Sequence, residues 1–338
     1  ASINIKKIMK KNNFDFLRIL AALAVLYSHH FALTGQIEPN FFGISSLGGA
    51  AVIVFFVISG YLTTGSWFND PNVLRFSLKR FLRIWPGLIV VILFSIFIIG
   101  PISTVLKWSE YFSSPVLLWY AKNILLKINY ALPGVFENNP YPHAVNGSLW
   151  SIPLEVKCYL ILAALGLFQL LKNKWVFLFI IFVYIIWFLN KNGVDFGRDF
   201  NLGRQMIAYF LVGAALAVLK PYWEQRSWLV IFSTILLTVL FIKIQLIFTA
   251  ALLALPILII LLGSKSTPLL INFGKFGDPS YGIYLYAFPI QQLMIFYFYE
   301  KYEFIGTLVF SIILTIAAAY SSWHIIEKNA LKLKPRRN

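Results

Sequence analysis

Long apolar stretches recur along the whole chain and alternate with short polar connections. A helix that crosses a bilayer needs about 20 mostly apolar residues. Stretches of this kind occupy residues 14–33, 47–65, 85–101, 149–171, 174–190, 203–219, 227–242, 247–262, 279–299 and 304–325. The pattern predicts an all-α fold: a polytopic membrane helix bundle with about ten transmembrane helices, forming a single domain over residues 1–338.

The composition agrees with a membrane location. Of the 338 residues, 59% are hydrophobic, 17% are aromatic and only 12% are charged. Average soluble domains carry about 25% charged residues, and aromatic residues gather where helices meet the membrane interfaces. These values exclude a soluble globular or disordered protein. The single cysteine, Cys158, can form no internal disulfide.

The net charge of +16 is distributed unevenly over the connections. With the N-terminus in the cytoplasm, the cytoplasmic segments hold more than twice as many Lys and Arg residues as the outer ones. The positive-inside rule then places both termini in the cytoplasm. The positive charge is explained by contact with anionic membrane lipids, and we expect no nucleic acid as a partner. The connection 102–148 becomes an outer loop, whose prolines and aromatic residues predict short surface helices.

The first span carries ionisable residues, which are costly inside a membrane and therefore indicate function. Arg18 and His29 lie on one helix face, about 16 Å apart along the axis. Because imidazole titrates near neutral pH, His29 is the candidate proton acceptor. His30, turned about 100° away, is a candidate to orient or replace it. The alternative is a snorkelling arginine with two interfacial histidines.

Two further groups of polar residues could carry chemistry. Arg80 and Arg83 share a helix face and form a possible phosphate clamp, although basic residues also occur at any cytoplasmic helix end. Glu155 could accept a proton from a substrate hydroxyl or fix a histidine tautomer. Asp278 is expected to open a helix as a cap. No spacing of His, Cys and carboxylate residues is typical of a metal site, so we expect no metal.

Six stretches form an ordered pattern along the chain: 14–18 with His29, 55–62, Arg80-x-x-Arg83, 148–159, 280–286 and 322–328. In these stretches and their order, the chain resembles acyltransferase family 3 over about residues 12–335. The members of that family are membrane proteins that O-acylate cell-surface polysaccharides. Three positions depart from patterns seen in some members. Ile53 stands where some members have an acidic residue, and Val156 stands where many have a second acid after the glutamate. Ala287 stands where some members have a histidine. Some relatives also carry a fused SGNH domain, which we do not expect here.

The resemblance implies a multi-pass enzyme of the bacterial inner (plasma) membrane. Acyl-CoA, usually acetyl-CoA, would be the co-substrate taken from the cytoplasm, and a hydroxyl of a cell-surface glycan or exopolysaccharide precursor on the outer side would be the acceptor. The family's essential residues correspond to Arg18 and His29, the arginine pair Arg80 and Arg83, and Glu155. From their positions in the sequence we also expect Trp150, Tyr281 and Tyr284 to contact substrate, although an aromatic stripe more often reflects helix packing. The oligomeric state stays open.

The mechanism and two other functions remain to be distinguished. His29 could deprotonate the acceptor hydroxyl with help from Glu155, or it could be acylated transiently. Both mechanisms require a continuous tunnel from the arginines to His29. Ten helices with buried charges also suit a secondary transporter for a small polar or anionic solute, although no inverted repeat is found. The third possibility is a non-catalytic acyl-CoA or lipid-binding scaffold.

Overall fold

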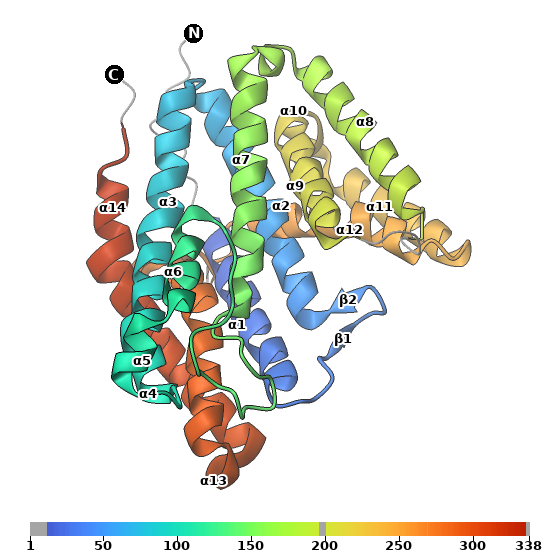
Figure 1. Cartoon of the computed structure of the whole chain (residues 1–338). Helices are drawn as coiled ribbons and strands as arrows, with labels where there is room; N and C mark the ends of the chain where they lie inside the picture. Colours follow the sequence, from blue (N-terminus) through green and yellow to red (C-terminus); the bar gives the residue numbers. More distant parts are fainter. Residues whose placement is uncertain (1–11, 196–200, 269, 336–338) are drawn as a thin grey trace.

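The computed structural model describes residues 12–195, 201–268 and 270–335, and most of them belong to helices (Figure 1). The helices are α1 (Phe14–Leu33), α2 (Leu47–Asn69), α3 (Val73–Phe94), α4 (Gly100–Ser103), α5 (Trp108–Ser113), α6 (Pro115–Ala121), α7 (Ser151–Leu167), α8 (Lys174–Asn192), α9 (Leu202–Val218), α10 (Lys220–Trp223), α11 (Ser227–Lys243), α12 (Ile247–Ser264), α13 (Ser280–Ser322) and α14 (Lys328–Lys332). Two short strands, β1 (Asn40–Phe41) and β2 (Ser45–Ser46), pair antiparallel between α1 and α2.

The described residues contain 8 helical segments that are long and apolar enough to cross a membrane. The last of these runs over 53 residues, Ser280–Lys332, which is far longer than one crossing requires. It is broken at Glu303, whose backbone angles (φ 50°, ψ −157°) are not helical, and Figure 1 shows the chain reversing at the lower end of α13. With this segment taken as two passes, and with the shorter apolar helix α9 added, the helices agree with the ten expected spans. The predicted polytopic helix bundle is confirmed.

The third helix begins earlier than its apolar stretch predicted. Helix α3 begins at Val73, where the Asn72 side chain accepts a hydrogen bond from the Arg75 backbone. Asp70 then binds Arg75 and Lys79, with nitrogen–oxygen distances of 2.6 and 2.7 Å. These hydrogen bonds hold the pKa of Asp70 well below its usual range. The polar first turns of α3 are thus stabilised by a cap and by ion pairs, which a search for apolar residues cannot detect.

Helices α2 and α9 approach each other closely because glycines lie at their contact. A Cβ atom on Gly60 would lie 1.9 Å from the carbonyl oxygen of Phe210, and one on Gly213 would lie 2.3 Å from that of Val57. Small residues allow this kind of backbone approach between membrane helices. The contact holds α2 in the interior of the bundle, so that Ser59 on α2 lies beside the cavity described below.

The long connection 102–148 folds as expected into short elements. It contains α5, α6 and a 3-10 turn at Lys122–Leu125. The hydroxyl of Tyr111 on α5 donates to the carbonyl oxygen of Ile96 at 2.8 Å and so fastens the connection to the helix before it. A second 3-10 turn at Gly147–Trp150 leads into α7.

Candidate active site

One cavity brings most of the predicted site residues together. It encloses about 810 Å³ of empty space, part of it open to solvent. Five helices supply its polar walls: α1, α2, α3, α7 and α13. The predicted residues that line it are Arg18 on α1, Arg80 and Arg83 on α3, Glu155 on α7, and Tyr281 and Tyr284 on α13.

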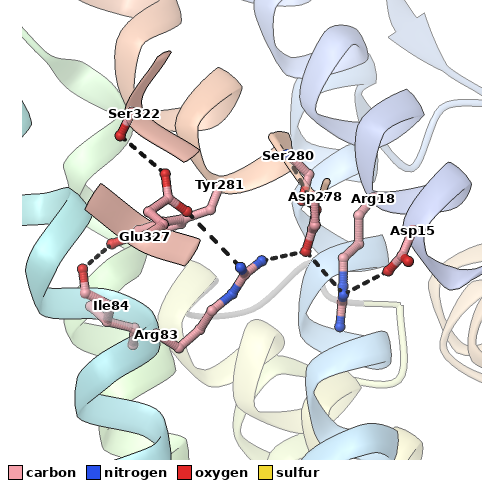
Figure 2. A network of polar contacts seen from close by, with 9 residues as sticks. All are labelled: Asp15, Arg18, Arg83, Ile84, Asp278, Ser280, Tyr281, Ser322 and Glu327. Atoms are coloured by element: carbon pink, nitrogen blue, oxygen red, sulfur yellow. Dashed lines mark hydrogen bonds and ion pairs between the residues drawn. The ribbon is translucent and has the colours of Figure 1, made fainter. Parts of the chain in front are cut away.

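At the arginine end, Asp278 lies between two of the three guanidinium groups, as Figure 2 shows. Its Oδ2 atom is 2.6 Å from Arg83 and 3.4 Å from Arg18. Asp15 lies 3.4 Å from Arg18 on the other side, and Glu327 lies 4.0 Å from Arg83. Arg18 and Arg83 therefore have carboxylate partners that hold them in place.

Asp278 carries a negative charge at neutral pH. Burial disfavours its charged form, but the charges of Arg83 and Arg18, with hydrogen bonds from Ser280, lower its pKa to about 2. The Ser280 hydroxyl donates to Asp278 Oδ1 at 2.5 Å at the start of α13. The residue expected only as a helix cap therefore also joins α1 to α3 through their arginines.

Arg80 differs from the other two arginines. It lies 5.8 Å from the ring centre of Phe76 and 5.7 Å from that of Tyr159, distances at which cation–π attraction operates. Its Nε atom is buried without a hydrogen-bond partner, and no carboxylate pairs with it among the residues that the structure describes. Arg80 is thus the cavity arginine most available to an anionic ligand.

Lys334, which follows α14, adds a further cation to the arginine end of the cavity. Burial and the positive charges of Arg80 and Arg83 lower the pKa of Lys334 to about 8. Lys79 and Arg18 add to this repulsion. A lysine that is repelled by several neighbouring cations gains from any anion that binds between them.

Glu155 forms a polar centre with two hydroxyl groups. Its Oε1 atom accepts a hydrogen bond from Ser59 Oγ at 3.0 Å and another from the Tyr159 hydroxyl. The two hydroxyl oxygens are 2.7 Å apart. Ser59 and Tyr159 both line the cavity, and both stand in the family-like stretches, although the sequence analysis assigned them no role. This centre can accept a proton or orient a polar substrate group.

The two tyrosines expected to contact substrate do line the cavity, but Trp150 does not. The Tyr281 hydroxyl donates to the carbonyl oxygen of Ile84 at 2.9 Å, and the Tyr284 hydroxyl lies 2.7 Å from Ser151 Oγ. Trp150 instead packs, partly buried, against the hydrophobic core. The next residue along the chain, Ser151, faces the cavity in its place.

His29 lies beyond the end of this cavity, so the expected continuous tunnel is not open in this structure. Its ring packs edge-on against Phe288, with the ring centres 5.4 Å apart. Phe288 is one helical turn from Tyr284, so these two aromatic residues of α13 stand at the boundary between the cavity and His29. Nδ1 of His29 is buried and makes no hydrogen bond within the described part of the chain.

The carboxylate whose charge acts on the His29 imidazole belongs to Glu38, not to Glu155. Glu38 accepts a hydrogen bond of 2.5 Å from the hydroxyl of Ser28, which precedes His29 in α1. Glu38 stands in a connection, where no helical periodicity marks its partners, so its position beside His29 could not be predicted from the sequence.

His30 is fully buried, and both of its ring nitrogens are occupied. Nδ1 lies 3.2 Å from the side-chain nitrogen of Gln291, which can only donate, so Nε2 carries the proton. Nε2 then donates to the carbonyl oxygen of Phe304 at 3.0 Å. Since Gln291 and Phe304 lie on opposite sides of the break in α13, His30 joins α1 to both halves. This arrangement favours a structural role over the predicted catalytic one.

Comparisons with known proteins agree with the family resemblance of the sequence. The profile of the acyltransferase domain family matches residues 11–325. An O-acetyl transferase of Shigella phage Sf6 is 32% identical over 333 residues, covering 95% of this chain and 96% of the relative. Nodulation protein 10 of Rhizobium leguminosarum bv. viciae is 30% identical over 168 residues, covering 46% of this chain and 44% of that relative. No solved structure matches the chain. Because the family profile and the phage relative each cover most of the chain, it belongs to acyltransferase family 3.

Proposed function

We propose that this protein is a membrane O-acyltransferase. It moves an acyl group, which we take to be acetyl, from cytoplasmic acyl-CoA to a hydroxyl of a cell-surface glycan. The family and the name of the phage relative support O-acylation. The observation that carries the proposal is that three arginines and Glu155 line the same cavity. The bias of basic residues towards the arginine end supports a cytoplasmic position for that end, in a bacterial inner membrane.

The arginine end suits the phosphates of coenzyme A. Arg80 has no carboxylate partner in the described structure, and Lys334 is repelled by its cationic neighbours. Both would gain from a bound phosphate. Arg18 and Arg83, aligned by Asp278, would supply further hydrogen-bond donors. The thioester would then lie deeper in the cavity, towards Glu155.

His29 is proposed as the base for the acceptor hydroxyl. The hydroxyl oxygen would attack the thioester carbonyl as His29 takes its proton, and the carbon–sulfur bond would break as the coenzyme A sulfur receives that proton. For the two substrates to meet, the side chains of Tyr284 and Phe288 have to move apart. Glu155, which faces the cavity already, would orient the acyl group through Ser59 and Tyr159.

The test compares variants at both ends of the cavity in membranes supplied with radiolabelled acetyl-CoA and surface glycan. We expect Arg80→Ala to raise the KM for acetyl-CoA by roughly tenfold or more, as the loss of a charged hydrogen bond implies. His29→Ala should abolish transfer without weakening acetyl-CoA binding. Lys157→Ala is the control, because this lysine is exposed on the same helix as Glu155. Full transfer by His29→Ala would refute the proposed base.

The same preparation separates the two chemical routes and the rival function. A protein-bound acetyl group that accumulates without acceptor and disappears in His29→Ala would show transient acylation of His29. Direct transfer leaves the protein unlabelled. A transporter would show no thermal stabilisation by acetyl-CoA and no transfer to glycan.

A further inference from the structure

A second cavity lies on the long connection and is lined by aromatic side chains. It contains about 960 Å³ of empty space, much of it open to solvent. Trp119 of α6, Tyr130 and Tyr141 contribute rings to its wall, and Asn129 and His143 contribute polar groups. We call this cavity the aromatic groove.

The three rings of the aromatic groove remain partly accessible. Trp119 is 53% exposed, Tyr130 is 41% exposed and Tyr141 is 45% exposed. Partial burial raises the pKa of Tyr130, and the neighbouring Tyr141 adds to the effect. The hydroxyl of Tyr130 therefore stays protonated at neutral pH and can donate a hydrogen bond.

Hydrogen bonds fix the backbone that carries these rings. The side-chain amide of Asn129 donates a hydrogen bond to the carbonyl oxygen of Trp119 at 3.0 Å. The backbone N–H of Val145 donates to the carbonyl oxygen of Tyr130 at 2.7 Å. The fully buried amide of Gln292 on α13 donates to the carbonyl oxygens of Tyr141 and Ala144, each at 2.8 Å. The groove is thus held in a preformed shape, which reduces the entropy cost of binding a ligand.

The aromatic groove is also connected to His29 through ring contacts. The ring of Tyr141 lies 6.2 Å from that of Phe288, and Phe288 lies 5.4 Å from His29. Tyr141 in the groove wall is therefore linked to His29 by two successive ring contacts, both made by Phe288. The arginine-lined cavity is bordered by Tyr284, one helical turn before Phe288 in α13.

We propose that the aromatic groove binds a saccharide, and that it positions the sugar whose hydroxyl receives the acyl group. Pyranose rings present faces of C–H groups that pack on aromatic rings, and hydroxyl groups around their edges. Trp119, Tyr130 and Tyr141 supply the ring faces, while the tyrosine hydroxyls and His143 supply hydrogen-bonding groups. The second half of this inference, the acceptor role, rests on the function proposed above.

The test uses the full-length protein in lipid nanodiscs with methyl α-pyranosides of glucose, galactose, rhamnose and N-acetylglucosamine. Saturation-transfer NMR reports which pyranoside touches the protein. We expect at least one to give a signal that falls fivefold or more in Trp119→Ala and in Tyr141→Ala. Tyr141→Phe, which keeps the ring, should lose less. Trp108→Ala is the matched control, because Trp108 is 67% exposed on α5 of the same connection but lies outside the groove.

Thermal stabilisation by acetyl-CoA is measured on every variant to keep the two proposals separate. Groove variants that lose the saccharide signal and keep the acetyl-CoA shift support the inference and show that the protein is folded. Absence of a signal from all four pyranosides overturns it. An equal loss in Trp108→Ala also overturns it, since that result indicates a lipid-interface role for these aromatic residues. A saccharide signal without any acetyl-CoA shift in the unmodified protein would refute the proposed function and retain the groove as a saccharide site.

Discussion

At the scale of single residues, two adjacent side chains in α1 have different surroundings. His29 has a buried nitrogen with no partner in the described structure, whereas both nitrogens of His30 are hydrogen-bonded. A buried group with satisfied hydrogen bonds stabilises the fold, and its removal leaves its partners unpaired. The two histidines should therefore respond differently to the same substitution.

We predict that His30→Ala lowers the stability of the protein by about 1–3 kcal/mol, because the Gln291 amide and the Phe304 carbonyl lose a partner. His29→Ala should leave stability within about 1 kcal/mol and remove activity. Cys158 provides the measurement, since it is the only cysteine and is 1% exposed. A thiol-reactive dye reports its exposure during heating. Equal midpoints for the two variants would contradict this division of roles.

A second residue-scale prediction concerns pH. The pKa of Lys334, about 8, lies below the ordinary value for lysine, so its charge is lost as the pH rises through 8. A polyanion favours the charged form, and binding is then accompanied by proton uptake. The affinity for acetyl-CoA should fall about tenfold between pH 7 and pH 9. Lys334→Arg, which stays charged, should show almost no change, and isothermal titration over this range distinguishes the two. Equal slopes would exclude Lys334 from the donor site.

At the scale of elements, the site depends on how closely α2 approaches α9. Gly60 is next to Ser59, and its missing side chain lets the two backbones meet. Any larger residue would push the helices apart and move the Ser59 hydroxyl away from Glu155. The polar centre and the packing of α2 are thus determined by the same contact.

Gly60→Ala is therefore expected to destabilise the protein by about 1–3 kcal/mol and to lower acyl transfer, because its Cβ would lie 1.9 Å from the Phe210 oxygen. Gly65→Ala on the same helix is the control, since nothing lies within 4 Å of its added Cβ. Alanine also has a higher helix propensity than glycine, so this control should be neutral or slightly stabilising. Thermal unfolding and transfer rates check both variants, and similar losses at Gly60 and Gly65 would argue against the close contact.

At the scale of the whole molecule, the carboxylate of Asp278 joins three helices by binding Arg18 and Arg83 at the start of α13. Its pKa of about 2 lies below the ordinary value, so the ion pairs contribute their full stability above about pH 4 and lose it as the pH falls towards 2. Over the neutral range the network stays intact.

We expect Asp278→Asn to cost about 3 kcal/mol of stability at neutral pH, because two mostly buried guanidinium groups lose their shared partner. Asp15→Asn is the control: its side chain is 42% exposed and pairs with Arg18 at 3.4 Å, so its loss should be below about 1 kcal/mol. The Cys158 dye assay measures both. A midpoint for Asp278→Asn equal to that of Asp15→Asn would show that the network does not hold the helices together.

The sequence by itself determined the class of the protein, its approximate number of spans and the arginines of the cavity. These features are local, because apolar length and helical spacing are set by neighbouring residues. Arg80 and Arg83 share a face through a separation of three residues, and both do line the cavity.

Only the tertiary structure decided which polar groups meet. Arg18 and Asp278 are 260 residues apart in the chain, and Ser59 and Glu155 are 96 residues apart. No periodic pattern records such pairs, because they depend on how whole helices pack. For the same reason the sequence placed His29 on the face of Arg18 but did not reveal that Phe288 and Tyr284 of a distant helix stand between the imidazole and the cavity.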